Sequence, residues 1–180
     1  MAMIPRLETK RLVLRPFSIN DAQTVQRLAG DWVVAETMLN VPHPYEDGMA
    51  EGWISTHQLD FDEGKGVTFA IARRETDEVV GAISLRMEQF SRANMGYWIG
   101  KPYWSKGYCT EAVKAVFAFS FGELKLNKIY ATYFPRNPAS GRVMEKAGMH
   151  YEGYLRQHVY KAGVYEDLKL YAILRDEFGG

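Results

Sequence analysis

The sequence predicts a mixed α/β protein built on a single sheet of about seven strands, largely antiparallel, with helices on both faces. Two apolar, partly β-branched runs, 67–73 and 79–87, are separated only by a short polar stretch, which is typical of an antiparallel hairpin. Further along, extended runs alternate with helical ones, and two extended runs follow them. The apolar residues of 111–124 spread over more than one helical face, so this helix is expected to be covered on more than one side.

The first part of the chain is expected to contain one strand and two helices. The run 11–15 reads as a strand, and Ser18 followed three residues later by Asp21 predicts the start of a helix. A second helix is expected over 44–62, although its glycines lower the helix propensity. The expected helices are 21–28, 44–62, 111–124 and 138–147.

The later part of the chain supplies the remaining elements. Pro138 near the first turn and Gly148 just past the end predict the helix 138–147. Two final extended runs flank Lys161–Gly163, as in a hairpin. The expected strands are 11–15, 67–73, 79–87, 94–99, 128–134, 151–159 and 165–174.

Composition excludes several classes of function. Lys and Arg total 22, as do Asp and Glu, so the net charge is zero and no nucleic-acid footprint is present. The single cysteine excludes an intramolecular disulfide and suits a reducing compartment. No stretch approaches the roughly 20 apolar residues of a membrane span, and no signal peptide is recognisable. The four histidines lack metal-ligand spacing. We expect a single cytoplasmic domain over 1–180, without membrane, nucleic-acid or metal partners.

The stretch Trp104–Ala112 is the most informative part of the chain. It joins the expected strand 94–99 to the apolar helix and contains Ser105, Lys106 and Gly107 at the turn. A small-residue turn that opens a helix presents unpaired N–H groups at the positive end of the helix dipole. The stretch lacks the spaced glycines of nucleotide-triphosphatase and dinucleotide loops. The sequence therefore predicts a site for a phosphate-bearing molecule held by a different kind of loop.

Three stretches, in the right order, resemble the Gcn5-related N-acetyltransferases, the GNAT superfamily. The family's pyrophosphate loop reads Gln/Arg-x-x-Gly-x-Gly/Ala; here Trp104, Gly107 and Cys109 stand at its three fixed positions. The stretch 137–149, Asn-Pro-Ala-Ser-Gly-Arg-Val-Met-Glu-Lys-Ala-Gly-Met, is similar to the family's second signature, and 12–17 near the start also matches. The resemblance is strongest to the ribosomal-protein-alanine and spermidine branch, and it implies the GNAT fold.

The resemblance implies that acetyl-CoA is the cosubstrate and an amine the acceptor, with a homodimer left open. The loop would grip the pyrophosphate through main-chain N–H groups, and Cys109 would serve only as a small residue. Strand 96–99 would splay from strand 128–134, so that the pantetheine arm pairs with its exposed backbone as an added strand would. The residues expected to bind the cosubstrate are Tyr97, Trp98, Ile99, Trp104, Ser105, Lys106, Gly107, Tyr108, Cys109, Thr110, Asn137 and Ser140.

Three residues are expected to serve the chemistry. A backbone N–H near Trp98 would polarise the thioester carbonyl, and Asn137 would contact the pantetheine amide. Many relatives protonate the leaving thiolate with a tyrosine, but Met144 occupies that position, which leaves Ser140 as the hydrogen-bond donor to the sulfur. The tyrosine and tryptophan at 97 and 98 could equally be core aromatics, and Ser140 a first-turn helix serine.

The sequence offers no obvious general base. Asn94 stands where some relatives carry a glutamate, and an amide cannot accept a proton from the amine. An α-amine with a pKa near 8 needs less help than a lysine near 10.4, so an N-terminal amine of a protein or peptide is favoured, attacked directly in a ternary complex. Two alternatives stay open: a small amine such as spermidine or an aminoglycoside, and a non-catalytic acyl-CoA sensor. A polyamine site would use carboxylates such as Glu46, Asp47, Glu51, Asp60, Asp62 and Glu63, which could also be a solvated acidic surface.

Overall fold

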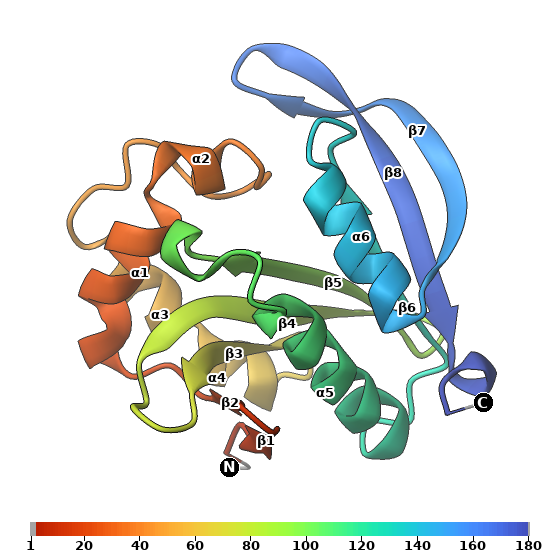
Figure 1. Cartoon of the computed structure of the whole chain (residues 1–180), viewed down its shortest axis with the longest axis horizontal. Coiled ribbons are helices and arrows are strands. Elements are labelled where there is room, and N and C mark those ends of the chain that lie inside the picture. The colour runs from red at the N-terminus through yellow and green to blue at the C-terminus, as the bar shows by residue number, and fades with distance from the viewer. Residues whose placement is uncertain (1–2, 180) are drawn as a thin grey trace.

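The computed structural model describes residues 3–179 and contains one eight-stranded sheet (Figure 1). The strand order is β1-β2-β3-β4-β5-β6-β8-β7, and every neighbouring pair is antiparallel except β5 and β6. The strands are β1 (Leu7–Glu8), β2 (Leu12–Arg15), β3 (Gly66–Arg73), β4 (Val79–Glu88), β5 (Arg92–Ile99), β6 (Lys128–Tyr133), β7 (His150–Lys161) and β8 (Val164–Leu174). The expected mixed, largely antiparallel sheet is confirmed, and the additional strand is the short β1.

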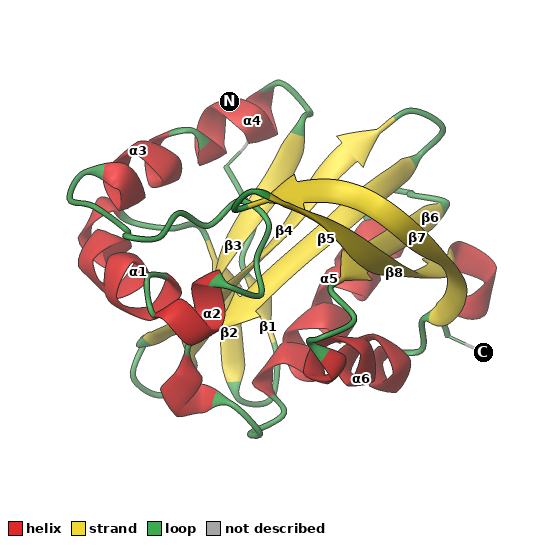
Figure 2. Ribbon diagram, turned by 90° about the horizontal axis from the view of Figure 1, so that it is seen from above, coloured by secondary structure: helices red, strands yellow, loops and turns green. Residues whose placement is uncertain are grey.

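Helices cover both faces of this sheet, as Figure 2 shows: α1 to α4 lie on one side, and α5 and α6 on the other. The helices are α1 (Ala22–Ala29), α2 (Trp32–Ala35), α3 (Met49–Ser55), α4 (His57–Asp62), α5 (Tyr108–Gly122) and α6 (Pro138–Ala147). Short 3₁₀ turns occupy Ile19–Asp21, Lys101–Tyr103 and Arg175–Glu177. None of the helices within 3–179 is long and apolar enough to cross a membrane.

The predicted helix starts have the expected local chemistry, with one exception. The Ser18 hydroxyl accepts from the Asn20 N–H, and the Asp21 carboxylate accepts from the Ser18 N–H at 2.8 Å, which completes a capping box. The single helix expected over 44–62 is wrong. Gly48 has a φ of 85°, so the helix begins only at Met49, and the chain breaks again at Thr56 into α3 and α4.

The alternation of β5 divides its side chains between two cores. Tyr97 packs with the large core beneath α5 and α6, whereas Trp98, 7% exposed, packs in a second cluster with α1 and α3. The two aromatic residues therefore face opposite sides of the sheet. This separation decides which of them can meet the start of α6.

The sheet opens between its only parallel pair. Pairing between β5 and β6 joins Arg92 to Lys128 and ends where Asn94 meets Tyr130. Beyond this point β5 stays paired with β4 up to Ile99, while β6 stays paired with β8. We call residues 95–99, on the side turned away from β4, the open edge of β5. The splaying that the family resemblance implied is confirmed.

Candidate functional site

The open edge of β5 presents backbone groups from alternate residues. The N–H of Gly100 donates to the carbonyl of Val80 at 2.9 Å, and the register from there to Trp98 and Ala82 is regular. In an antiparallel pair, every second residue bonds its partner strand and the residue between points the other way. The N–H of Trp98 therefore turns toward β4, and those of Tyr97 and Ile99 turn toward the opening. The expected backbone N–H near Trp98 would therefore be that of Tyr97 or Ile99, on either side of it.

The loop before α5 forms the second part of the site. Ser105 and Gly107 both have positive φ, 61° and 76°, and Gly107 is the N-cap of α5. Within residues 3–179, the backbone N–H groups of 106–110 have no protein acceptor, and the first of the helix to bond is that of Glu111. Five donors thus gather at the positive end of a 15-residue helix. This is the physical basis of an anion site, and a pyrophosphate fits its chemistry.

Arg11 stabilises this loop through hydrogen bonds that the sequence did not predict. Its Nη1 donates to the carbonyl of Lys106 at 2.8 Å, and its Nε donates to Oε2 of Glu111 at 2.7 Å. Burial alone would raise the pKa of Glu111, but hydrogen bonds from Thr9 and Arg11 outweigh burial and lower that pKa. The carboxylate is therefore ionised and neutralised by Arg11 instead of repelling an anion at the loop.

The side chains of the loop mostly brace it. The indole Nε1 of Trp104 donates to the carbonyl of Ile99 at 2.6 Å, which ties the loop to the end of β5. The Nζ of Lys106 lies 5.5 Å from the centroid of the Tyr103 ring. Cys109 is half-buried, and burial raises the pKa of its thiol, which opposes a nucleophilic role. The main chain is thus left as the principal contact surface for a phosphate.

The start of α6 brings Asn137 and Ser140 to the same region. Asn137 is the N-cap residue, but its side chain makes no capping bond and has no other hydrogen-bond partner among the described residues. The Ser140 hydroxyl lies 3.0 Å from the hydroxyl of Tyr97, whose ring comes from the open edge of β5. Met144 is buried, 1% exposed, and contributes no polar group. Two hydroxyls and one free amide therefore gather where β5, β6 and α6 meet.

Asn94, which stands where some relatives carry a glutamate, is the last residue of β5 paired with β6. Glu88, at the end of the neighbouring strand β4, accepts from the Tyr130 hydroxyl at 2.6 Å, and this bond lowers the pKa of Glu88. Its proton affinity is reduced, and it lies at the closed end of the β5–β6 pair, away from Tyr97. The site thus supplies hydrogen-bond donors without an evident proton acceptor.

The acidic residues of 46–63 do not form a common cluster. Asp47 accepts from Gln26, and Asp62 accepts from Gln58, while Glu63 pairs with Lys65. No group of three or more His, Cys, Asp or Glu side chains in residues 3–179 is arranged to hold a metal ion. Asp47, Asp62 and Glu63 are thus engaged with separate local partners.

The α2 segment and the β7–β8 hairpin lie on the same side of the molecule (Figure 1). Side chains from the second half of the chain join them. The Nζ of Lys161 donates to the carbonyls of Ala35, at 2.7 Å, and Met38. Arg136 donates through Nη2 to the carbonyl of Glu36 at 2.9 Å and pairs through Nη1 with Glu166. Two cations therefore bind backbone carbonyls at the end of α2 and just past it.

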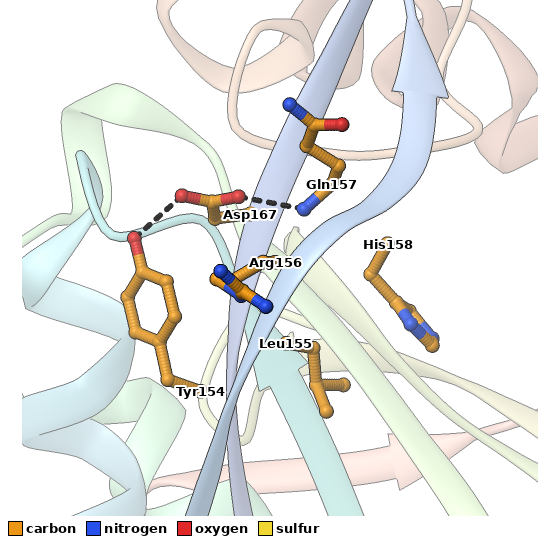
Figure 3. A pocket seen from close by; sticks show the side chains of 6 residues that line it. All are labelled: Tyr154, Leu155, Arg156, Gln157, His158 and Asp167. Carbon is orange, nitrogen blue, oxygen red and sulfur yellow. Dashed lines mark hydrogen bonds between the residues drawn. The ribbon is translucent and has the colours of Figure 1, made fainter.

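A separate hollow lies on the outer strand β7, where a bulge interrupts its pairing with β8 (Figure 3). Asp167 accepts there from the Tyr154 hydroxyl and from the Gln157 N–H, each at 2.7 Å. The side chains of Leu155, Arg156 and His158 complete the lining. None of the residues expected to bind acetyl-CoA lines this hollow.

The opened parallel pair and the helix N-terminus with unpaired amides form an arrangement suited to an extended ligand that bears phosphate. Residues 11–150 match the family model described as acetyltransferase (GNAT) domain. The chain belongs to this family, and it is an acetyl-CoA-dependent N-acetyltransferase. The expected family, fold, reaction class and cosubstrate are confirmed.

Known relatives agree with this assignment. The N-acetyltransferase YoaA of Bacillus subtilis is 32% identical over 176 residues, which cover 96% of this chain and 98% of the relative. The [ribosomal protein uS5]-alanine N-acetyltransferase of Escherichia coli is 27% identical, covering 93% and 90%. A solved GNAT-family acetyltransferase from Bacillus anthracis superposes with a TM-score of 0.85 at 28% identity, covering 96% and 99%.

Proposed function

We propose that the protein acetylates the N-terminal α-amine of a protein or peptide, by direct attack on acetyl-CoA in a ternary complex. The observation that carries this proposal is Asn94 at the position where a base would be expected, with no carboxylate among the hydrogen-bond partners of Tyr97 in residues 3–179. About a tenth of α-amines are neutral at pH 7, against far fewer lysine side chains. The similarity to the uS5-alanine acetyltransferase of E. coli supports the same acceptor class.

The proposed roles follow from the positions of the chain's own groups. The loop 104–110 holds the pyrophosphate through its N–H groups, and Asn137 donates its free amide to the pantetheine arm. The N–H groups of Tyr97 and Ile99 face the opening and polarise the thioester carbonyl. Ser140 donates a hydrogen bond to the departing sulfur. When bound, acetyl-CoA supplies an activated acetyl group and a leaving thiolate.

We place the chain as one acetyltransferase domain over 1–180 that acts in the cytoplasm. One sheet links the described residues from Leu7 to Leu174. The only cysteine, Cys109, is a free thiol, which suits a reducing compartment.

A thiol-release assay with acetyl-CoA and a panel of amines tests the acceptor. Short peptides with a free N-terminal alanine should be turned over, whereas the same peptides with a blocked N-terminus and an internal lysine should not. Spermidine and an aminoglycoside complete the panel. Turnover of spermidine above that of every peptide would overturn the proposed acceptor and identify a small-amine acetyltransferase.

A further inference from the structure

The hydroxyl of Tyr97 is the feature that the family assignment leaves without a role. Tyr97 lies on the open edge of β5, and its side chain points into the core that α5 and α6 cover. Its hydroxyl lies 3.0 Å from Oγ of Ser140 and 3.1 Å from the carbonyl oxygen of Ser140. A phenol from one wall of the opening therefore touches the first turn of α6 on the other wall.

We infer that Tyr97 is a positioning residue that acts through Ser140, holding the serine hydroxyl ready to donate to the departing thiolate. The inference rests on the proposed role of Ser140, but it does not depend on which amine is the acceptor. It also explains how the site works with Met144 where many relatives carry a tyrosine. The phenolic group is supplied by β5 and reaches the sulfur indirectly, through the serine.

Two hydrogen-bonding arrangements are possible between these groups. In one, Tyr97 donates to the carbonyl of Ser140, and the Ser140 hydroxyl donates to the tyrosine oxygen, so its proton does not point at the sulfur. In the other, Tyr97 donates to Ser140 Oγ, which frees the serine proton to point at the sulfur. The second arrangement becomes favourable when negative charge develops, because a chain of hydrogen bonds polarises toward an anion.

The environment keeps the phenol protonated. Burial raises the pKa of Tyr97, and the nearby Cys109 thiol and Tyr133 phenol add to this effect. A buried tyrosine that does not ionise remains a donor throughout the working pH range. In the reaction, the amine nitrogen bonds to the acetyl carbon, the C–S bond breaks and its electron pair stays on sulfur. The amine proton passes to solvent, so Tyr97 and Ser140 stabilise the thiolate without losing protons of their own.

Tyr97→Phe is the decisive variant because it keeps the ring and removes only the hydroxyl. With the best acceptor of the amine panel, kcat should fall by about tenfold while the KM for acetyl-CoA changes little. In a Ser140→Ala background, the same change should have almost no further effect, because the two residues act as a unit. Tyr171→Phe is the matched control. Its hydroxyl also tethers α6, but it does so through Glu145, at 2.9 Å, and not through Ser140.

A binding measurement tests the inference without turnover. Calorimetry above the pKa of the CoA thiol should show Tyr97→Phe binding CoA about tenfold more weakly, with unchanged affinity for desulfo-CoA. Equal affinity for CoA and full kcat in Tyr97→Phe would overturn the inference. An undiminished loss of kcat on adding Tyr97→Phe to the Ser140→Ala variant would overturn it too. If Ser140→Ala alone were fully active, the proposed role of Ser140 would be refuted together with that of Tyr97. If only Tyr97→Phe were fully active, the role of Tyr97 alone would be refuted, so the two claims can be told apart.

Discussion

At the residue scale, His57 is the side chain most at odds with its surroundings. It is 5% exposed, and neither ring nitrogen has a hydrogen-bond partner in the described part of the chain. Its ring packs edge-on against Trp53 at 4.4 Å between centroids and lies 5.5 Å from Phe17. Burial lowers the pKa of His57 to about 4, from an ordinary value of 6.5.

This histidine predicts a loss of stability in mild acid. Between pH 6.5 and 4 the unfolded chain binds a proton at His57 that the folded chain does not, so stability falls as the pH falls through this window. The free energy of unfolding should drop by about 2 kcal/mol between pH 7.5 and 5 from this residue alone. Urea unfolding at both pH values should show a smaller drop in His57→Phe. The exposed His158→Gln serves as control, and an unchanged drop in His57→Phe would refute the assignment.

Gly107 allows a second prediction at this scale. Its φ of 76° strains any β-branched residue, and a Cβ would meet Nη2 of Arg11 at 3.4 Å. Gly107→Val should therefore weaken acetyl-CoA binding by at least about tenfold, since the strain costs on the order of 1–3 kcal/mol. Calorimetry on the folded variant measures this. Gly163→Val is the control, because Gly163 also has positive φ, 85°, but lies in the β7–β8 turn. Undisturbed affinity in Gly107→Val would remove the loop from the binding site.

At the element scale, the conformation of the loop before α5 is stabilised by Arg11, the residue that precedes β2. Arg11 joins the loop carbonyl of Lys106 to the first-turn carboxylate of Glu111. These contacts use the carbonyl of Lys106 and the carboxylate of Glu111, so the backbone N–H groups of 106–110 stay available to an anion. The loop is thus organised by a part of the chain about 100 residues away.

Arg11→Gln should loosen the loop while leaving the sheet intact. We expect the Kd for acetyl-CoA to rise by about fivefold, which corresponds to one hydrogen bond of about 1 kcal/mol. The melting temperature should change little, because the side chain is 44% exposed and its ion pair is screened. Arg92→Gln, which breaks an ion pair with Glu88 at the opposite end of β5, is the matched control. Equal affinity in both variants would contradict this role of Arg11.

The same contacts show which parts of the structure could be predicted from the sequence. α6 has the predicted bounds because its Pro138 and Gly148 signals are local. The four-residue α2 has too few residues to show a period, and its carbonyl end is satisfied by Arg136 and Lys161 from distant segments. The Arg11–Glu111 and Tyr97–Ser140 contacts are equally invisible to local patterns. Residue types could be matched to the family, but their partners required the fold.

At the scale of the whole molecule, the site forms where two halves of the sheet separate. β1 to β5 carry one wall, and β6, β8 and β7 carry the other. The cations Arg136 and Lys161 join the second half back to the α2 segment. Both halves contribute hydrogen-bond donors to the opening. In the proposed function the amine loses its proton to solvent, because the amide of Asn94 cannot serve as a base.

The pH profile should therefore be set by the acceptor. The rate should rise with pH, and its midpoint should follow the pKa of the substrate amine, near 8 for an α-amine and near 10.4 for a lysine side chain. Initial rates for two such substrates, measured across the same pH series, make the comparison. A midpoint fixed near 6 to 7 for both would show that the protein supplies a histidine or carboxylate base.

The open edge of β5 has one more consequence, which concerns how long the protein survives. Tyr97 and Ile99 turn backbone groups toward a place that no strand fills, so an occupant adds hydrogen bonds to the folded chain that the unfolded chain cannot make. At a hundredfold excess over its Kd, acetyl-CoA would add about 2.7 kcal/mol to the resistance to unfolding. For a chain of this size, that corresponds to a melting temperature higher by roughly 5–10 °C. The lifetime of the enzyme against proteases would thus rise and fall with the supply of its own acetyl donor.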